Sequence, residues 1–469
     1  MRLTKIVCTL GPSSDSPEAI YAIAKEGMNV ARINFSHGSE ESHRALIQTV
    51  RQVNEAHDLS IALLLDTNGS DIRTGDIKTP LVIAKGQEVV FSSSAAPGKK
   101  EPHIQVSYDA FAKDVQQAEC IIVDNGTMIF DVVKILPDGG VVARSRDDGE
   151  IGSRRHINLP GAFVSLPALT EKDWQDLTFG IEERMDMAAL SFIRTAEEVQ
   201  TVRKYLQERG STMRLISKIE TRHAVDNIDT IIAASDGIMV ARGDLGVEIP
   251  FERVPAIQDM IVQKCIRAGK PVIVATHMLE SMIEHPIPTR AEVTDIAHAV
   301  TTRADATMLS GETAKGEHPV EAVRAMARIQ EETESHMQQQ WPFHLACPLG
   351  ERHALAEAAV RMAFSLRAAA ILVLTRTGKT AQTISTLRPM LPIIALTESA
   401  DVERALHLSY GVFPHIIAFD RDPEETVKRA LDLVREQHLV SHAQNVVIVT
   451  DAKTHTGTVR TVQVRTVDA

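Results

Sequence analysis

Eight short apolar segments alternate with helix-like segments, and no other feature of the sequence narrows the possible folds so strongly. Strands joined through helices pair in parallel, because each helix crosses back over the sheet before the next strand begins. Eight parallel strands are the number that closes a barrel. We therefore predict an α/β protein with a (β/α)8 TIM barrel, and its strands are expected at Lys5–Leu10, Val30–Phe35, Ile61–Leu65, Met187–Ile193, Arg214–Ile219, Gly237–Ala241, Pro271–Ala275 and Ala306–Leu309.

The alternation is interrupted between the third and fourth apolar segments, where about 120 residues replace a single helix. Residues 70–166 are rich in valine, glycine and turn sequences such as Pro137-Asp-Gly-Gly140, a composition typical of short strands joined by tight turns. We predict that residues 70–166 form a small inserted β-barrel domain that acts as a lid. The catalytic barrel then comprises residues 1–69 and 167–342.

The chain beyond the eighth strand indicates another domain. A helix is expected over 319–340, followed by a linker over 341–350. Four more apolar segments separated by helices then predict an open, doubly wound α/β sheet covered on both faces. This C-terminal domain is expected over residues 343–469, with strands at Ala369–Leu374, Leu391–Leu396, Val412–Phe419 and Val446–Val449.

Charge and cysteine content exclude several classes of protein. The 469 residues carry a formal net charge of −12, which argues against an extended nucleic-acid surface. No segment is apolar and long enough for a signal peptide or a membrane span. The four cysteines are too widely spaced for a zinc site or a disulfide framework: they are Cys8, Cys120, Cys265 and Cys347. We expect a cytoplasmic protein with neither nucleic-acid nor membrane partners.

Polar side chains gather where the predicted barrel strands end. Arg32, Asn34 and Ser36 alternate along the second strand, and Lys218 and Glu220 have the same two-residue spacing on the fifth. Alternate residues of a strand share a face, and TIM-barrel active sites lie at the carboxyl ends of the strands. The other strand ends contribute Asp66, Thr67, Asp244, Thr276, Ser310 and Glu312.

These residues suit phosphoryl transfer. Glu220 and Asp244, without nearby Cys ligands, favour a hard cation such as Mg²⁺ or Mn²⁺. Arg32, Lys218 and Arg73 would neutralise phosphoryl oxygens beside that metal. The competing interpretation is that strand-end charges merely pair with one another.

Six segments of the sequence resemble pyruvate kinases, and the likeness extends over nearly the whole chain. The segments are Lys5–Pro12, Arg32–Gly38, Ser217–Glu220, Met239–Pro250, Pro288–Glu292 and Met308–Gly316. The resemblance implies a glycolytic enzyme that transfers the phosphoryl group of phosphoenolpyruvate to ADP and then protonates the enolpyruvate.

Individual roles follow from the same resemblance. Arg32 and Lys218 would hold the phosphoryl group, and Thr276 is associated with protonation of the enolate. Gly243 and Asp244 would place their backbone amides near the substrate carboxylate, whereas Arg242 is expected to be structural or intersubunit. The resemblance further implies Mg²⁺ at Glu220 and Asp244, K⁺ at Asn34, Ser36, Asp66 and Thr67, nucleotide contacts from Arg73, Arg155, Lys172 and His37, and a pocket lined by Ser310 and Glu312.

The resemblance also implies a homotetramer with a possible sugar-phosphate effector. The effector would lie on a loop between a strand and a helix of the C-terminal domain, where glycine, lysine and hydroxyl groups suit phosphate. Its residues would be Thr375, Thr377, Gly378, Lys379 and Thr380.

Several positions depart from the family pattern. Asn68, Ser70 and Asp71 stand where the family usually has Lys, Pro and Glu, and Val459 and Arg460 alter the usual partner loop of the effector site. Two alternatives therefore stay open. One is a divergent paralogue with weak or no kinase activity that serves in effector binding or assembly. The other is a magnesium-dependent lyase or mutase that acts on an enolpyruvate-type substrate.

Overall fold

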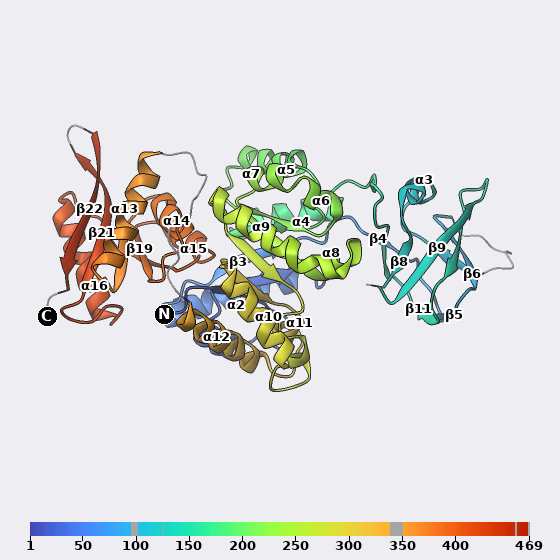
Figure 1. The fold of residues 1–469 in the computed structure, drawn as a ribbon, viewed down its shortest axis with the longest axis horizontal. Coiled ribbons are helices and arrows are strands. Elements are labelled where there is room, and N and C mark those ends of the chain that lie inside the picture. The colour runs from blue at the N-terminus through green and yellow to red at the C-terminus, as the bar shows by residue number, and fades with distance from the viewer. Residues whose placement is uncertain (95–101, 125, 338–349, 455–456, 468–469) are drawn as a thin grey trace.

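Eight parallel strands form a closed barrel at the centre of the molecule (Figure 1). The structure is a computed structural model that describes residues 1–94, 102–124, 126–337, 350–454 and 457–467. The barrel order is β1-β17-β16-β15-β14-β13-β3-β2. The strands are β1 (Lys5–Thr9), β2 (Val30–Asn34), β3 (Ala62–Asp66), β13 (Met187–Leu190), β14 (Arg214–Ile219), β15 (Gly237–Ala241), β16 (Val272–Ala275) and β17 (Ala306–Leu309). All eight predicted strands are confirmed, although β13 ends three residues before its predicted end.

Alternate residues of these strands face the barrel interior and the surrounding helices. Val7, Leu64 and Ile216 belong to the apolar cluster inside the barrel. Their neighbours Leu63 and Leu215 belong to the larger cluster between strands and helices. This two-residue period follows from the strand geometry, and it determines which side chains reach the active site further along each strand.

Helices surround the barrel. Several begin with a side-chain cap, which gives a hydrogen-bond partner to backbone amides that have none at a helix start. Ser16 accepts a hydrogen bond from the amide of Ala19 at 3.2 Å. The Thr170–Asp173 and Thr289–Glu292 pairs form capping boxes. The helices are α1 (Pro17–Glu26), α2 (Glu40–His57), α4 (Glu171–Glu182), α5 (Ala196–Glu208), α6 (Arg222–Asp226), α7 (Ile228–Ala234), α8 (Arg242–Glu248), α9 (Val254–Ala268), α10 (Arg290–Thr301), α11 (Gly311–Ala314) and α12 (Pro319–His336).

The segment between β3 and α4 forms a separate β-rich part with its own apolar core. A mostly antiparallel sheet has the order β4-β12-β8-β9-β10-β6-β7, and β5 and β11 pair beside it. Just beyond β4 and β7, a bridge between Thr74 and Val106 joins the two edges of the seven-stranded sheet, so the sheet curls toward the barrel shape that the sequence predicts. Its elements are β4 (Ile72–Arg73), β5 (Leu81–Ile83), β6 (Glu88–Ser92), β7 (His103–Gln105), α3 (Phe111–Asp114), β8 (Ile121–Val123), β9 (Met128–Ile135), β10 (Val141–Ser145), β11 (Gly149–Ile151) and β12 (His156–Asn158).

The C-terminal part is an open sheet of order β20-β19-β18-β21-β22. Two apolar clusters lie on its opposite faces, as predicted. The antiparallel edge strand β22 was not predicted, because polar residues occupy much of it. The elements are α13 (Glu351–Ser365), β18 (Ala370–Leu374), α14 (Lys379–Thr386), β19 (Ile393–Thr397), α15 (Ala400–Leu406), β20 (Val412–Ile416), α16 (Pro423–Glu436), β21 (Asn445–Thr454) and β22 (Gly457–Thr466). The predicted linker over 341–350 lies, apart from Gly350, outside the described residues.

The three parts lie in a row with the barrel in the middle (Figure 1). A buried ion pair joins the barrel to the C-terminal part: the guanidinium of Arg388 lies 2.6 Å from Asp305, and both side chains are at most 3% exposed. Asp305 also accepts the amide hydrogen of Tyr410 at 2.9 Å, and Leu408 packs with the residues inside the barrel. The exact limits of the three domains stay a prediction.

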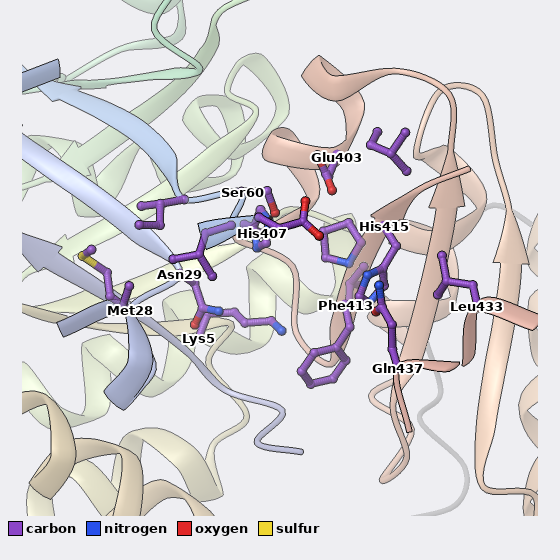
Figure 2. A pocket seen from close by; sticks show the side chains of 17 residues that line it. Lys5, Met28, Asn29, Ser60, Glu403, His407, Phe413, His415, Leu433 and Gln437 are labelled. Carbon is purple, nitrogen blue, oxygen red and sulfur yellow. Dashed lines mark hydrogen bonds between the residues drawn. The ribbon is translucent and has the colours of Figure 1, made fainter. Parts of the chain in front are cut away.

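A cavity of about 420 Å³ lies along the same contact (Figure 2). Lys5 and Ser60 line it from the barrel, and Glu403, His407 and His415 line it from the C-terminal part. The ring of His407 lies 2.6 Å from the hydroxyl of Ser60.

Among the described residues, no helix has both the length and the apolar character needed to cross a bilayer.

Candidate active site

The inward-facing positions of the barrel strands change from apolar to charged at the carboxyl ends. On β2 the inward series runs from Val30 to Arg32, and on β14 it runs from Ile216 to Lys218 and on to Glu220 just beyond the strand. The period that buries the apolar residues therefore also directs these charged groups toward the mouth of the barrel.

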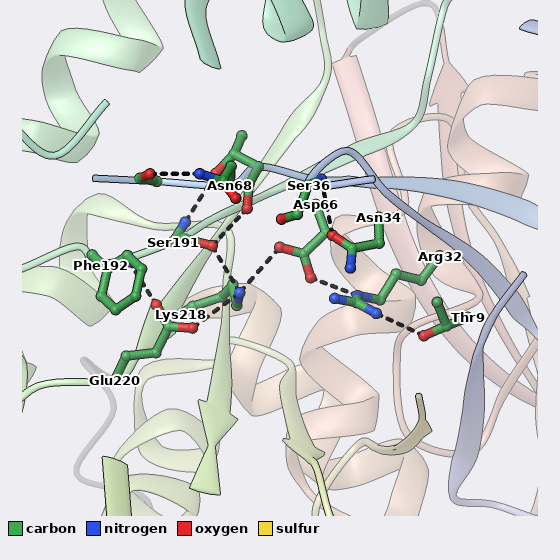
Figure 3. Close-up of polar contacts among 12 residues, drawn as sticks. Thr9, Arg32, Asn34, Ser36, Asp66, Asn68, Ser191, Phe192, Lys218 and Glu220 are labelled. Atoms are coloured by element: carbon green, nitrogen blue, oxygen red, sulfur yellow. Dashed lines mark hydrogen bonds and ion pairs between the residues drawn. The ribbon is translucent and has the colours of Figure 1, made fainter. Parts of the chain in front are cut away.

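Asp66 at the end of β3 connects the two cations of this group (Figure 3). Its Oδ2 atom lies 2.5 Å from Nε of Arg32, and its Oδ1 atom lies 3.2 Å from Nζ of Lys218. Arg32 also donates a hydrogen bond to the hydroxyl of Thr9 at 2.8 Å. Asp66 is only 1% exposed, so it holds both cations from below while their other faces stay available to the cavity.

Lys218 has two further partners. Its Nζ atom lies 2.9 Å from Oε1 of Glu220, and it donates a hydrogen bond to Oγ of Ser191 at 2.7 Å. Ser191 in turn donates to the carbonyl of Thr67 at 2.7 Å. The second oxygen of Glu220 accepts the amide hydrogen of Phe192 at 2.6 Å. The ammonium group is thereby fixed in position by residues from three different strand ends (Figure 3).

Burial and charge shift the pKa values of this cluster. Burial opposes the charged ammonium, but Asp66 and Glu220 together raise the pKa of Lys218 above its usual value. Burial likewise favours a neutral Asp66, yet Arg32 and Lys218 hold its pKa below the ordinary value. For Glu220, burial and then the nearby charge of Asp244 raise the pKa to about 7, against the opposing effect of Lys218. Lys218 stays a cation at neutral pH, whereas Glu220 is a carboxylate that a second positive charge would stabilise.

A cavity of about 340 Å³ opens above this cluster, between the barrel mouth and the inserted part. The barrel supplies Arg32, Asn34, Ser36, Thr67, Asn68, Ser191, Phe192, Lys218, Glu220 and Asp244, and the inserted part supplies Asp71, Arg73, Asp124, Arg154, Arg155 and His156. Five cationic and four anionic side chains thus line one space. Such a lining suits a polyanionic substrate together with a metal cation.

Glu220 and Asp244 fit a divalent cation. Both line the cavity, and the negative charge of Asp244 raises the pKa of Glu220, as expected for two carboxylates without a full set of counterions. Among the described residues, no group of three or more His, Cys, Asp or Glu side chains could hold a metal by itself. Mg²⁺ usually takes one or two protein carboxylates and completes its shell with water and substrate oxygens, and Glu220 and Asp244 offer such a pair of carboxylates.

The residues expected at K⁺ also lie together. Asn34, Ser36 and Thr67 line the cavity, and Asp66 lies directly beneath it. Oδ1 of Asp66 makes an ion-pair contact with Lys218 but no well-directed hydrogen bond. Its neighbours are oxygen donors, so the set has the chemistry of an alkali-cation site.

Two expected site residues pair with each other beside this cavity and do not line it. The amide of Gly243 donates a hydrogen bond to Oγ1 of Thr276 at 2.7 Å, so this amide is already engaged and is not turned to a substrate carboxylate in this structure. The hydroxyl of Thr276 donates to the carbonyl of Ala275 at 2.6 Å. Thr276 has a φ of 69°, a strained conformation of the kind that is common at functional sites.

Arg242, which the sequence analysis expects to be structural or intersubunit, makes two strong contacts within the chain. Its guanidinium donates to the carbonyl of Thr276 at 2.6 Å and pairs with Asp295 at 2.6 Å. Its side chain is 10% exposed. Arg242 therefore anchors the turn that carries Thr276.

Four more expected residues lie away from the cavity lining. Glu312 is 3% exposed and accepts amide hydrogens from Leu279 at 3.1 Å and Ser310 at 2.7 Å, so it holds the ends of β16 and β17 together. Lys172 donates to the carbonyl of Phe35 at 2.8 Å and pairs with Asp176. The residues that line the cavity at the barrel mouth do not include His37, Lys172 or Ser310.

The sequence interpretation missed several lining residues. Ser191 was placed inside a longer fourth strand, whereas β13 ends at Leu190 and presents Ser191 to Lys218. Arg154 and Asp124 come from turns of the inserted part, and His156 is the first residue of β12. Burial chiefly lowers the pKa of His156, with Asp71 and Asp244 opposing. No local signal identifies such turn residues, because tertiary packing alone brings them over the barrel mouth.

The expected effector loop precedes α14. Thr375 accepts the amide hydrogen of Gly378 at 3.0 Å, and Gly378 has a φ of 75°, which glycine adopts without steric cost. Thr380 is buried, whereas Thr377 and Lys379 are exposed.

Comparison with known proteins assigns the family. A family model described as "Pyruvate kinase, barrel domain" matches residues 1–323, and one described as "Pyruvate kinase, alpha/beta domain" matches residues 353–465. The chain belongs to the pyruvate kinase family. It is 40% identical to a pyruvate kinase of Clostridium acetobutylicum, with all of both chains covered. Pyruvate kinase 1 of Trypanosoma brucei brucei is 44% identical over 96% of this chain and 92% of that protein.

A solved pyruvate kinase structure has the same architecture. The pyruvate kinase of Cryptosporidium parvum superposes with a TM-score of 0.93 at 36% identity, covering 98% of this chain and 96% of that one. The predicted family and fold class are thus confirmed, and the chain is an enzyme of the pyruvate kinase family.

Proposed function

We propose how this chain carries out the pyruvate kinase reaction, in which phosphoenolpyruvate donates its phosphoryl group to ADP to give pyruvate and ATP. The observation that carries the proposal is the placement of Arg32 and Lys218 on Asp66, both facing one cavity that also contains Glu220 and Asp244. Two fixed cations beside a carboxylate pair match the charge of a phosphoryl group in transfer.

In this mechanism Arg32 and Lys218 bind the oxygens of the transferred phosphoryl group. The bond between phosphorus and the enol oxygen breaks while a bond to the terminal oxygen of ADP forms. Lys218 remains protonated, because Asp66 and Glu220 raise its pKa, so it stabilises the negative charge on the phosphoryl group. Ser191 positions the ammonium group through its 2.7 Å hydrogen bond. The resulting enolate then gains a proton at carbon, a step in which we place Thr276.

Glu220 and Asp244 would hold Mg²⁺ or Mn²⁺, and Asn34, Ser36, Asp66 and Thr67 would hold K⁺. The divalent cation supplies neutralisation of phosphoryl charge when bound. Occupation of Glu220 by a cation would also relieve the repulsion that raises its pKa. Both cofactor assignments are supported by the oxygen-rich donor sets of the two groups.

The nucleotide is proposed to enter from the side of the inserted part. Arg73 and Arg155 line the cavity there. Arg73 pairs with Asp71 at 2.7 Å and Arg155 lies 3.5 Å from Asp124; both are half exposed and so are available to phosphate oxygens. Lys172 and His37 would need to leave their present contacts to join them.

Three broader features extend the proposal. A homotetramer is implied by family resemblance and is tested by sedimentation equilibrium, where a monomeric mass would refute it. A sugar phosphate on Thr375–Thr380 is supported by the glycine at the start of α14, and unchanged phosphoenolpyruvate saturation with fructose 1,6-bisphosphate would count against it. A cytoplasmic location is supported by free, buried thiols at the three described cysteines, which are typical of reducing compartments; fractionation of cells tests it.

The decisive assay follows pyruvate formation from phosphoenolpyruvate and ADP with Mg²⁺, with and without K⁺. We expect turnover that K⁺ stimulates and that nearly vanishes in Lys218→Met. Absence of turnover in the wild type under every ionic condition would refute the proposal and favour a divergent paralogue, despite the intact cluster. Product formation without ADP would instead favour a lyase or mutase.

A further inference from the structure

A third cavity, of about 430 Å³, lies at the opposite end of the barrel from the active site. The barrel lines it with the start of β14 and with the residues that precede β15 and β16. The C-terminal part closes it with Thr377 of the loop before α14 and with Lys379, the first residue of that helix. It therefore spans two domains on the side of the barrel away from the inserted part (Figure 1).

The lining of this cavity carries an excess of positive charge. Arg203, Arg214, Lys270 and Lys379 face a single acidic residue, Asp236. That carboxylate is already engaged, because its Oδ2 atom lies 2.8 Å from Arg203 and accepts the amide hydrogen of Leu215 at 2.9 Å. Among the residues that the structure describes, no carboxylate forms a contact-distance ion pair with Arg214, Lys270 or Lys379, although Asp236 and Asp186 lie near enough to Arg214 to oppose the lowering of its pKa by burial.

Arg214 is the clearest sign of a missing partner. Within the part of the chain that the structure describes, its half-buried guanidinium makes no hydrogen bond or ion pair. Lys270 donates only to the carbonyl of Ser235. Burial lowers the pKa of Lys270, and the neighbouring charges of Arg203 and Arg214 lower it further, against Asp236. Unpaired, partly buried cations are costly unless an anion compensates them.

We propose that this cavity binds the phosphate group of a small phosphorylated compound, held between Arg214 and Lys270 of the barrel and Lys379 of the C-terminal domain. Guanidinium and ammonium donors recognise phosphate strongly through charge-assisted hydrogen bonds. The cavity is larger than a phosphate ion, and Ser211, Thr212 and Thr377 line the remaining space. These hydroxyl groups suit a ligand that itself carries hydroxyl groups.

Such a ligand would link the C-terminal domain to the barrel. Arg214 begins β14, the strand that carries Lys218 at its other end. The site shares Thr377 and Lys379 with the proposed effector loop, but its phosphate would also contact Arg214 and Lys270 of the barrel, which lie outside the C-terminal domain. A Cβ atom at Gly269 of the barrel would lie 3.4 Å from Cγ2 of Thr386 in α14, so the two walls lie close together beside the cavity.

The test is isothermal titration calorimetry of the full chain with inorganic phosphate and with glycerol 3-phosphate at constant ionic strength. All variants carry Arg32→Gln, which removes phosphate binding in the active-site cavity. We expect binding that weakens at least tenfold in Arg214→Gln and in Lys379→Gln. Tighter binding of glycerol 3-phosphate would identify an organic phosphate as the ligand, and equal binding would identify free phosphate.

A matched control is Lys204→Gln, which removes a 78% exposed cation of α5 outside the cavity. Its binding should stay within twofold of the parent. Lys379 is exposed at the first position of α14, so Lys379→Gln should remain folded even if Arg214→Gln does not. The proposal is overturned if neither anion binds. It is also overturned if a folded Arg214→Gln binds normally while Lys379→Gln does not, because the ligand would then lie on the effector loop alone.

Discussion

Nζ of Lys218 lies 2.9 Å from Oε1 of Glu220. The residue proposed to neutralise the phosphoryl group and the residue proposed to bind the metal therefore touch before either ligand is present. The pairing of strand-end charges is therefore present, and it is compatible with the proposed roles, because the same two groups also line the cavity. Removal of one partner leaves the other buried and uncompensated.

Thr276 should be sensitive to loss of its hydroxyl. Thr276→Val removes the acceptor for the amide of Gly243 and the proposed group of the protonation step, and we expect kcat to fall about 100-fold. Thr276→Ser keeps the hydroxyl and should lose no more than about threefold. Steady-state kinetics of both variants provide the measurement. Equal losses in the two variants would contradict the assignment, because Thr276→Ser keeps the hydroxyl that Thr276→Val lacks.

Arg73 should affect the nucleotide more than the phosphoryl donor. Its guanidinium lines the cavity on the side of the inserted part, so Arg73→Gln is expected to raise KM for ADP about 10-fold, equivalent to about 1.4 kcal/mol. KM for phosphoenolpyruvate should change little. The control is Arg146→Gln, which removes an exposed pair with Asp131 outside the cavity. A selective rise in KM for phosphoenolpyruvate would contradict the assignment.

The buried pair of Asp305 and Arg388 should stabilise the contact between barrel and C-terminal domain. Asp305→Asn leaves the guanidinium buried without a counterion, and we expect the free energy of unfolding to fall by about 3–5 kcal/mol. Asp401→Asn is the control: it removes a 77% exposed partner of Arg404 and should cost below about 1 kcal/mol. Urea denaturation followed by circular dichroism compares the two. If the two variants lost similar amounts of unfolding free energy, the buried pair would not stabilise the protein more than an exposed pair does.

His407 should make stability sensitive to acid. Burial, helped by the charges of Lys5, His415 and Arg404, lowers its pKa to about 3 from the usual 6.5. Between these values the unfolded chain binds a proton that the folded chain does not, so stability falls as pH drops below 6.5, by up to about 1.4 kcal/mol per pH unit.

His407→Gln should remove this slope between pH 6.5 and 4.5, a difference of about 2–3 kcal/mol, measured by urea unfolding at each pH. Glu403 acts in the opposite direction, because burial raises its pKa to about 7, so the comparison must be made against the wild type at each pH. The exposed His285 provides the matched control, and His285→Gln should leave the slope intact. An unchanged slope in His407→Gln would contradict the assignment.

Local pattern was enough to predict the barrel and its central charges. Apolar runs such as β15 are buried on both faces, so their length and spacing identify parallel strands from the sequence alone. The two-residue period places Arg32 and Lys218 on the inward face, because a strand alternates its side chains regardless of what surrounds it. Glu220 follows from the same reasoning, whereas Asp244 was identified because it comes just after the end of β15, in α8.

Tertiary structure alone decided which of these residues share a cavity. The inserted part brings His156 and Arg154 over one half of the barrel mouth, where β2, β3, β13 and β14 end, while Thr276 and Glu312 bond within the other half. The basic cavity around Arg214 likewise depends on a contact between residues far apart in sequence. Burial of one face of a strand produces a two-residue repeat of apolar residues in the sequence. Packing between separate domains depends on contacts between residues far apart in the chain, and such contacts produce no repeat in the sequence.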